Sequence, residues 1–229
     1  MRPLPEPRAS SVDGIVERLT EAVHEHRVMP GTKLREDEVG EIFGVSRTLV
    51  RQALRAMEHG GLVTIERNRG AFVAKPSIKE AREVFEARAL LEPQTARAAA
   101  ERATPQDIEE LLCHIDLEHQ ALARDESGLA LKLSGAFHCT IARIADQHTI
   151  EGFLRQLVSR SSLVIALYWR RRNALCESHA HHALVDAFRA GDSDSAADLM
   201  KGHLLDLVSQ LDLRERPGET VSLRSALFK

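Results

Sequence analysis

The segment that most constrains the fold is GVSRTLVRQALRAMEHGGLV, residues 44–63. Its apolar side chains recur at helical spacing and predict one buried helix face, formed by Leu49, Val50, Ala53, Leu54 and Met57. Its basic side chains recur every four residues and share a second face, formed by Arg47, Arg51 and Arg55. Ser46 is placed to cap the start of this helix, and Gly60 and Gly61 end it. The chain therefore contains a helix with one side in a core and a cationic side turned outward.

Flanking elements complete a small domain around this helix. Periodicity predicts a first helix over residues 13–26, and REDEVGEIFG predicts a short second helix that buries Val39, Ile42 and Phe43. Two β-type runs, LVTIE and AFVAK, follow the third helix and are separated by RNRG, which predicts a hairpin. This order is that of a winged helix-turn-helix, whose third helix enters the major groove of DNA. We assign residues 12–76 to this domain and residues 1–11 to a flexible tail.

From residue 77 onward, Ala, Leu, Arg and Glu dominate, and short turn sequences separate helical segments. The expected helices cover residues 78–102, 105–123, 127–146, 149–172, 177–190 and 193–212. Pro93 lies inside the first of them and predicts a kink or a split. The expected fold is mainly α, with an N-terminal winged helix-turn-helix and a C-terminal all-α antiparallel helical bundle over residues 77–212, followed by a tail over 213–229.

Composition narrows the classes of function. A net charge of -3 argues against a polycation that coats nucleic acid, yet residues 47–75 hold six basic and two acidic residues. The cysteines show no Cys-x-x-Cys spacing, so we expect neither a disulfide framework nor a thiolate zinc site from Cys113, Cys139 and Cys176. No segment approaches the roughly 20 apolar residues that span a bilayer, and the N-terminus lacks the apolar core of a signal peptide. We expect a cytoplasmic protein with no membrane contact.

Three of the eleven histidines fall on apolar faces of separate predicted helices: His138, His181 and His203. Six others fall on polar faces or helix ends and are expected at the surface: His24, His26, His59, His119, His179 and His182. A lone histidine on an apolar face is usually a hydrogen-bonded core residue. Three that converge from different helices favour a metal site, because neutral imidazoles ligate zinc, nickel and related ions. A metal-free histidine pocket is the alternative.

Arg88 shares a helix side with Val84 and Leu91, so its charge is expected inside the bundle. A buried arginine needs an anionic partner. One candidate is Glu92, one turn later in an ordinary i,i+4 pair. The other is the carboxylate of a small ligand, and the spacing does not separate the two.

The residues from Pro30 to Val73, PGTKLREDEVGEIFGVSRTLVRQALRAMEHGGLVTIERNRGAFV, resemble the DNA-binding domain of the GntR family of bacterial transcription regulators. The bundle resembles the all-helical FCD effector domain of the FadR-type subgroup, in RALLE at 88–92, FH at 137–138, GD at 191–192 and HL at 203–204. The resemblance implies a transcription regulator and not an enzyme.

A set of DNA contacts follows for the winged domain. In the first turn of the third helix, the guanidinium of Arg47 can bind guanine bidentately where free backbone amides already favour a phosphate. The resemblance assigns contacts to Ser46, Arg47, Thr48, Arg51 and Gly70. Arg35 and Lys33 are expected to touch the DNA backbone, and Arg69 completes the predicted set. Arg55 lies nearer the edge of the groove and is left outside it.

For the bundle, the FCD resemblance assigns the same three histidines as ligands of a divalent metal, zinc or nickel. It also reveals a departure, because relatives carry an aspartate one turn before the FH histidine, where this chain has Ser134. The residue before His181, often glutamate in relatives, is Ala180. Loss of the carboxylate lowers the negative charge of the site. The resemblance further implies a small organic acid as effector, held by Arg88 and the metal.

The leading hypothesis is a homodimeric regulator, of the repressor type, on a palindromic double-stranded DNA operator. A small carboxylate effector would shift its operator affinity by binding two domain arrangements unequally. One alternative is a three-histidine metal hydrolase with an appended DNA-binding module, disfavoured because no acidic residue lies beside the histidines at a spacing that suggests a general base. The other is a constitutive DNA-binding protein whose bundle only dimerises.

Overall fold

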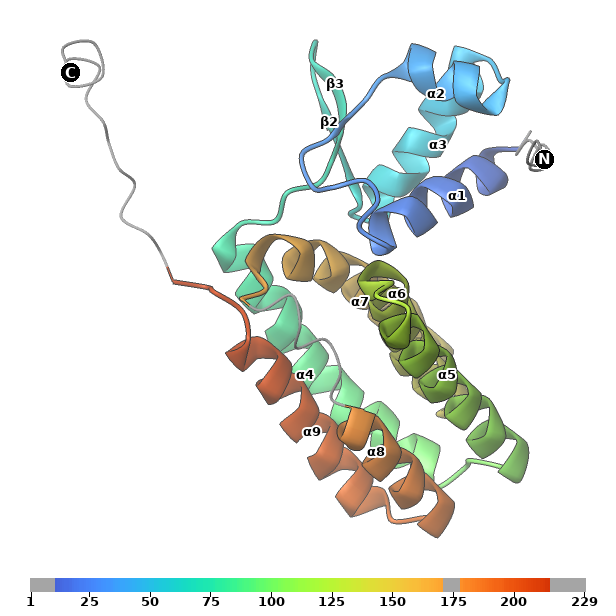
Figure 1. Cartoon of the computed structure of the whole chain (residues 1–229), viewed down its shortest axis with the longest axis vertical. Helices are drawn as coiled ribbons and strands as arrows, with labels where there is room; N and C mark the ends of the chain where they lie inside the picture. The colour runs from blue at the N-terminus through green and yellow to red at the C-terminus, as the bar shows by residue number, and fades with distance from the viewer. Residues whose placement is uncertain (1–10, 171–177, 215–229) are drawn as a thin grey trace.

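The structure is a computed structural model that describes residues 11–170 and 178–214. A small winged module lies at one end of an elongated helical bundle (Figure 1). The module consists of α1 (Val12–His24), β1 (Lys33–Leu34), α2 (Glu36–Phe43), α3 (Arg47–His59), β2 (Val63–Glu66) and β3 (Gly70–Val73). The bundle consists of α4 (Ile78–Ala100), α5 (Pro105–Ala123), α6 (Ser127–Ile144), α7 (His148–Tyr168), α8 (Ser178–Ala190) and α9 (Ser193–Ser209). The expected mainly α fold, a winged helix-turn-helix followed by a helical bundle, is confirmed.

Capping and apolar spacing define the helices of the winged module. The Ser46 hydroxyl accepts a bond from the amide of Leu49 at the start of α3, and Gly44 ends α2 in the left-handed conformation at φ 68°. The buried face of α3 is formed by Val50, Ala53, Leu54 and Met57. Ile42 was predicted to be buried, but this prediction is wrong, since its side chain is 67% exposed. Helix α2 has little more than two turns, and its buried residues are Val39 and Gly40.

The wing is a three-stranded sheet in the order β1-β3-β2. The predicted hairpin is present, with Glu66 opposite Gly70 at its closed end. Asn68 and Gly70 adopt positive φ angles of 63° and 98°, which the tight turn requires. Sequence periodicity missed β1, because a strand of two residues shows no alternation.

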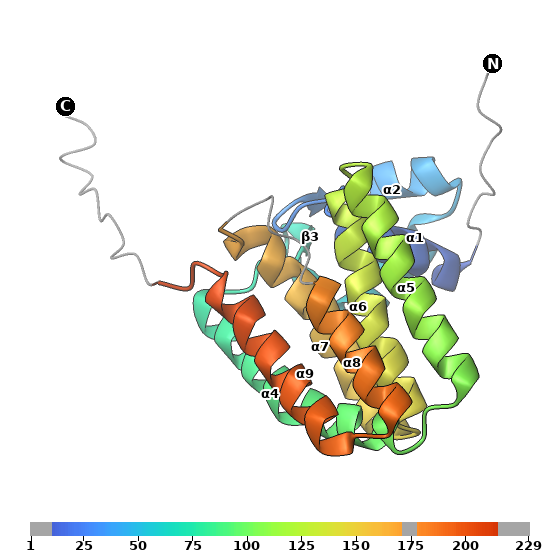
Figure 2. The same cartoon turned by 60° about the horizontal axis from the view of Figure 1, so that its bottom comes forward.

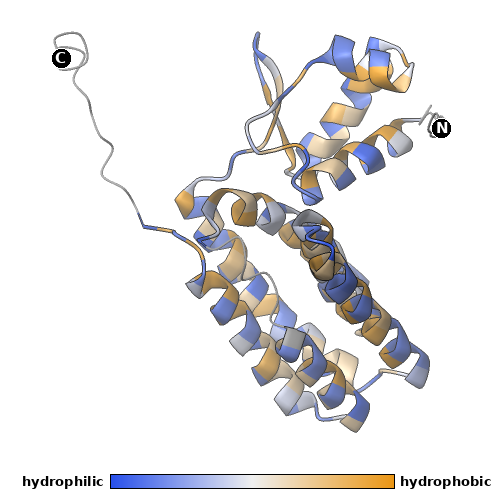
Figure 3. Ribbon diagram, viewed as in Figure 1, coloured by the Kyte–Doolittle hydropathy of each residue, from blue (hydrophilic) through white to orange (hydrophobic). Residues whose placement is uncertain are grey.

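The bundle helices pack along their apolar stripes. Helix α4 contacts α9 along its length, and α5 contacts α6 in the same way (Figure 2). Hydrophilic and hydrophobic residues are mixed along each bundle helix, as expected of helices with one buried and one exposed side (Figure 3). The core between them includes Leu111, Ile115, Phe137, Ile141 and Met200. Helix α4 runs through Pro93 without interruption, so the predicted split does not occur.

Parts of the prediction fall on undescribed residues. The predicted tails over 1–11 and 213–229 lie largely outside the described residues, and so do Cys176 and residues 171–172, where one helix was expected to end. Cys113 and Cys139 are free cysteines. Among the helices that the structure describes, none has the length and apolar character needed to cross a membrane.

The winged module and the bundle share a packed interface. Helix α1 contacts both α6 and α7. Leu163 of α7 is fully buried and belongs to the hydrophobic cluster of the winged module, beside residues such as Ile15 and Leu54. The position of the module on the bundle is therefore set by apolar packing as well as by the chain connection.

Candidate DNA-binding surface and histidine site

The predicted recognition helix α3 turns its arginines outward. The side chains of Arg47 and Arg51 are 65% and 59% exposed. Each is nevertheless paired with a carboxylate of α2: Arg47 lies 2.8 Å from Asp37 Oδ1, and Nε of Arg51 donates to Glu36 at 2.8 Å. Exposed ion pairs of this kind contribute about 0–1 kcal/mol. A phosphate can therefore replace either carboxylate at little cost.

The remaining predicted DNA contacts are exposed in the same module. Thr48, Arg35 and Gly70 all lie at the surface. Arg69 pairs with Glu66 and, with Lys33, sits over the ring of Phe72 at 5.6 and 5.5 Å from the ring centroid. The pair and the stacking hold the basic side chains of the wing in defined positions.

The three predicted histidines meet in the bundle core. His138 comes from α6, His181 from α8 and His203 from α9, and each is at most 4% exposed. One nitrogen of each ring lies within 4.8 Å of the corresponding nitrogens of the other two. The Nε2 atoms of His138 and His203 are 3.3 Å apart. Three separate helices thus place their imidazoles around one point.

Two buried glutamates face the far sides of these rings. Glu92 Oε2 lies 2.6 Å from His138 Nδ1, and Glu118 Oε2 lies 3.2 Å from His181 Nδ1. A carboxylate on Nδ1 fixes the tautomer that offers Nε2 as a ligand, which is the usual support of a metal-bound histidine. Sequence reasoning named Glu92 as a partner of Arg88 alone, did not single out Glu118, and found no acidic residue beside the histidines at a spacing that suggests a general base. The two glutamates belong to α4 and α5, so only the packing of helices brings them to the site.

The donor set fits a divalent transition metal. Among the described residues, Nε2 of His181 is buried without a hydrogen-bond partner, which is costly unless a ligand occupies the site. Burial lowers the pKa of His203 to about 2 and also lowers the pKa of His138. Both rings are therefore neutral, the form that binds metal. Ser134, at the position of the usual aspartate, lines the adjoining cavity and supplies no carboxylate.

Arg88 is 3% exposed and forms the ordinary i,i+4 pair with Glu92, Nε to Oε1 at 2.5 Å. Its NH1 also donates to Ser161 Oγ at 3.0 Å. Burial on its own raises the pKa of Glu92, but Arg88 and His138 hold that pKa far below its usual value. Glu92 is therefore an anion shared by the arginine and the histidine.

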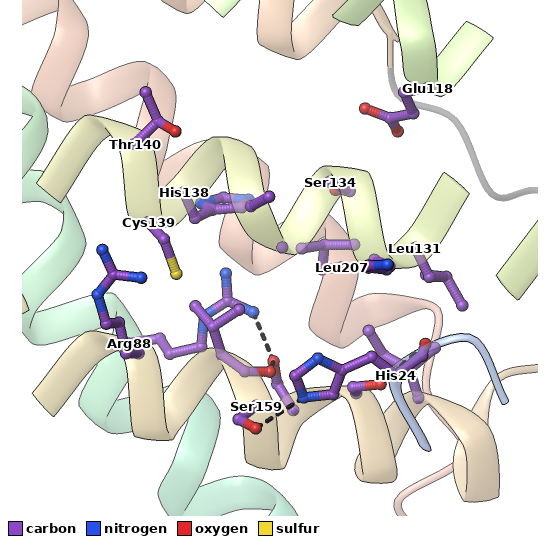
Figure 4. A pocket seen from close by; sticks show the side chains of 18 of the residues that line it. His24, Arg88, Glu118, Leu131, Ser134, His138, Cys139, Thr140, Ser159 and Leu207 are labelled. Carbon is purple, nitrogen blue, oxygen red and sulfur yellow. Dashed lines mark hydrogen bonds between the residues drawn. The ribbon is translucent and has the colours of Figure 1, made fainter. Parts of the chain in front are cut away.

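A cavity of about 530 Å³ adjoins this cluster (Figure 4). All three histidines and Arg88 line it, and so do Cys139 and Trp169. Burial raises the pKa of the Cys139 thiol to about 11, so this thiol is protonated at neutral pH. The volume suits a small organic molecule.

The structure corrects three of the histidines predicted at the surface. His24 and His26 are half-buried against α7, where His24 Nε2 lies 2.7 Å from Ser159 Oγ and His26 Nε2 lies 3.0 Å from the Ser162 carbonyl. The Nε2 atom of His119 is also buried. Polar flanking residues suggested solvent, but α7 of the bundle covers His24 and His26, and the ring of His119 stacks on that of His182 of α8. The others, His59, His179 and His182, are exposed as expected.

The family comparison agrees with this architecture. Residues 11–73 match the bacterial regulatory proteins of the gntR family, and residues 83–206 match the FCD domain. The chain therefore belongs to the GntR family of transcription regulators and carries an FCD domain, which confirms the resemblance seen in the sequence. Both domains are those of regulators, so the prediction that the chain is not an enzyme is confirmed and the hydrolase alternative is dropped.

Individual relatives cover most of the chain. The Nta operon transcriptional regulator of Aminobacter aminovorans is 29% identical over 167 residues, 73% of this chain and 79% of that protein. The HTH-type transcriptional repressor RspR of Escherichia coli K12 is 29% identical over 184 residues, 79% of each. A GntR transcriptional regulator from Rhodococcus sp. RHA1 has the same fold, with a TM-score of 0.79 at 24% identity over 90% of this chain and 99% of its own.

Proposed function

We propose that this regulator is a repressor that binds a palindromic operator as a homodimer. We further propose that a small organic acid, bound beside zinc or nickel in the helical domain, sets its operator affinity. The observation that carries the proposal is the cavity, because three clustered histidines and a buried arginine line it together. A metal bound by His138, His181 and His203 would supply positive charge for a ligand carboxylate. Arg88 would orient that carboxylate, although its charge is already shared with Glu92.

The proposal of a homodimer on a palindromic operator follows from the DNA affinity expected of a single winged module. One winged module neutralises few phosphates and binds weakly at physiological salt, whereas two modules on paired half-sites recover the affinity. Relatives named as repressors, such as RspR of E. coli, support the direction of regulation. Mass measurement by light scattering, alone and with DNA, tests the dimer.

The DNA contact is tested with Arg47→Ala. A duplex is first selected from a random library with the wild-type protein, and binding is then measured by fluorescence anisotropy. We expect Arg47→Ala to lose about 1–3 kcal/mol of affinity for the selected duplex and much of its preference over unrelated DNA. Arg189→Ala, at an exposed, ion-paired arginine of α8, is the matched control and leaves affinity unchanged. Unchanged binding by Arg47→Ala contradicts the assignment of α3 as the groove helix.

The metal is tested by elemental analysis of purified protein. We expect about one zinc or nickel per chain in the wild type and strongly reduced content in His138→Ala. His182→Ala removes an exposed histidine of α8 and retains the metal. Equal metal content in all three proteins contradicts the site.

The effector is tested by thermal shift with organic acids, with and without zinc. A ligand at 100 times its Kd stabilises the folded state by about 2.7 kcal/mol. Any acid that raises the melting temperature is then added to the DNA-binding assay. Absence of a shift across the panel favours the alternative of a constitutive DNA-binding protein whose bundle only dimerises.

A further inference from the structure

The wall of the cavity is not built by the bundle alone. His24, the last residue of α1, belongs to the winged module and lines the same cavity as the histidine cluster. Its Nε2 atom lies 2.7 Å from Ser159 Oγ of α7 (Figure 4). A ligand that fills the outer part of this cavity therefore touches the DNA-binding module directly.

Lys132 of α6 lies at the interface between the winged module and the bundle. It lines the cavity, and its ammonium group pairs with Glu21 and, at 3.0 Å, with Oε1 of Glu25, both on the α1 side of the interface. Partial burial on its own lowers the pKa of Lys132, but the bonds to Glu21 and Glu25 raise it above its usual value. One cation thus faces the cavity and fastens the winged module to the bundle.

The docking of α1 on α6 is close at the backbone. A Cβ atom added to Gly128 would lie 1.9 Å from the carbonyl oxygen of Glu25, and 2.6 Å from its carbonyl carbon. Any side chain at position 128 must separate the two segments, because backbone atoms cannot move aside as a flexible side chain can. Gly128 does not line the cavity, and it belongs to neither the histidine cluster nor the Arg88 pair, so this contact can be broken without substituting a residue of the inner site.

We propose that the cavity takes an acid with at least two anionic groups, and that the outer group draws Lys132 away from Glu21 and Glu25 and so releases α1 from the bundle. This inference rests on the proposed function, since the inner anionic group is the one held beside the histidines. It adds the class of effector and the route by which the DNA-binding module senses it.

Charge decides the direction of the change. A ligand carboxylate at Lys132 would bring a third anion to an ammonium group that already holds two carboxylates. Like charges at this distance repel, and partial burial weakens the screening by solvent. The side chains of α1 are displaced in preference to the ligand, because the ligand is also held at its inner end. The basic residues that line the cavity are Arg88, Lys132, Arg143 and Arg155, and the acidic ones are Glu110 and Glu118. Each basic group is already paired with a carboxylate, so a ligand anion must compete with an existing pair. Of these pairs, those of Lys132 join the bundle to the winged module.

The first test breaks the docking without any ligand. Gly128→Ala is compared with Gly152→Ala, a helical glycine of α7 whose added Cβ meets nothing within 4 Å. We expect Gly128→Ala to raise hydrogen exchange in the last two turns of α1 at least about tenfold. Operator affinity should change by about 5- to 150-fold, the usual range of coupling between sites, while zinc affinity stays the same. Gly152→Ala should change none of these. Faster exchange in α1 with unchanged operator affinity overturns the inference.

The second test uses citrate and acetate on zinc-loaded protein. Trp169, the one tryptophan of the chain, lines the cavity and reports binding by its fluorescence. We expect citrate to bind and to accelerate exchange in α1, and acetate, with a single charge, to leave α1 protected. In Lys132→Met, the amides of α1 should exchange hydrogen fast even before citrate is added. Citrate should then cause no further increase in their exchange rate. Citrate binding that leaves α1 protected overturns the inference, and so does failure of citrate to bind.

The two proposals fail in different ways. A wild-type protein that does not bind the duplex, or that contains no metal, contradicts the proposed function. If the protein binds the duplex, contains the metal and responds to an acid while α1 stays docked, only this inference is contradicted. The proposed function is then still supported.

Discussion

Glu92 Oε2 lies 2.6 Å from His138 Nδ1, and the same carboxylate is paired with Arg88 inside the bundle. One buried anion therefore orients a predicted metal ligand and neutralises the arginine predicted to hold an effector. Arg88 forms the i,i+4 pair with Glu92 that the sequence allowed, and it also lines the cavity, where its contact with a ligand carboxylate stays a prediction.

Glu92→Gln should weaken zinc binding by about 10- to 100-fold, the usual effect of removing the partner of a metal-bound histidine. The amide keeps the shape of the side chain but loses the charge that favours the Nδ1 proton of His138. The measurement is competition for zinc against a chromophoric chelator, on protein shown by circular dichroism to be folded. The circular dichroism measurement is needed because Arg88 loses its buried partner in this variant. Such a loss lowers the free energy of unfolding by about 3–5 kcal/mol.

Glu118→Gln provides the comparison for this prediction. Glu118 is 3.2 Å from His181 Nδ1, a longer contact than that of Glu92 with His138. A smaller loss of zinc affinity is expected. Equal affinity for zinc in wild type and both variants means that neither glutamate supports a metal ligand.

Glu36→Gln should strengthen DNA binding. In the unbound protein, Glu36 holds the guanidinium of Arg51, and this pair must open before a phosphate can take its place. An exposed pair is weak, so its removal should tighten binding only modestly, by about 1.5- to 5-fold. Fluorescence anisotropy with the selected duplex measures the gain.

Arg51→Ala is the reciprocal variant. It should weaken binding and lower the salt slope by about one phosphate contact. A Glu36→Gln protein that binds DNA more weakly than wild type shows that Glu36 supports the DNA-bound geometry of Arg51 and contradicts the prediction.

Leu163→Ala should destabilise the winged module although residue 163 belongs to the bundle. The side chain is fully buried in the hydrophobic cluster around Leu54 and Met57. Truncation of a buried leucine costs about 2–5 kcal/mol. Urea unfolding, followed by circular dichroism, gives the loss. Leu205→Ala, with a side chain 57% exposed on α9, should change the free energy of unfolding by less than about 0.5 kcal/mol.

The sequence predicted the helices well because periodicity and capping are local. Helix α5 was expected over residues 105–123 and occupies them, since Thr104 and Asp107 form a reciprocal capping box before a regular apolar stripe. The meeting of His138, His181 and His203 was also predictable, because each faces the interior of its own helix.

The carboxylates of the site could not be found in this way. Glu118 lies 63 residues from His181 in sequence, and no periodic pattern links them. His24 and His26 were misplaced for a related reason, since the surface that buries them belongs to another domain. Sequence patterns identify which face of a helix is buried, whereas contacts between helices depend on tertiary packing.

The docking of the winged module on the bundle should weaken in acid through His24. Burial lowers the pKa of His24 to about 4, with a smaller contribution in the same direction from Lys132 and His26 and an opposing one from Glu25. The ring is therefore neutral in the docked protein and titrates near 6.5 when it is exposed. Between pH 6.5 and 4 the unfolded chain binds a proton that the folded protein does not, so stability falls as pH falls through this window.

His24→Gln removes this titration and keeps a group that can hydrogen-bond Ser159. The wild type should lose up to about 3 kcal/mol more stability than the variant between pH 6.5 and 4, since each unit of pKa shift corresponds to about 1.4 kcal/mol. The measurement is urea unfolding of both proteins across this range. All other histidines are the same in both proteins, so their contributions cancel in the difference. Parallel stability curves for the two proteins would show that His24 is open to solvent and that α1 is not docked in solution.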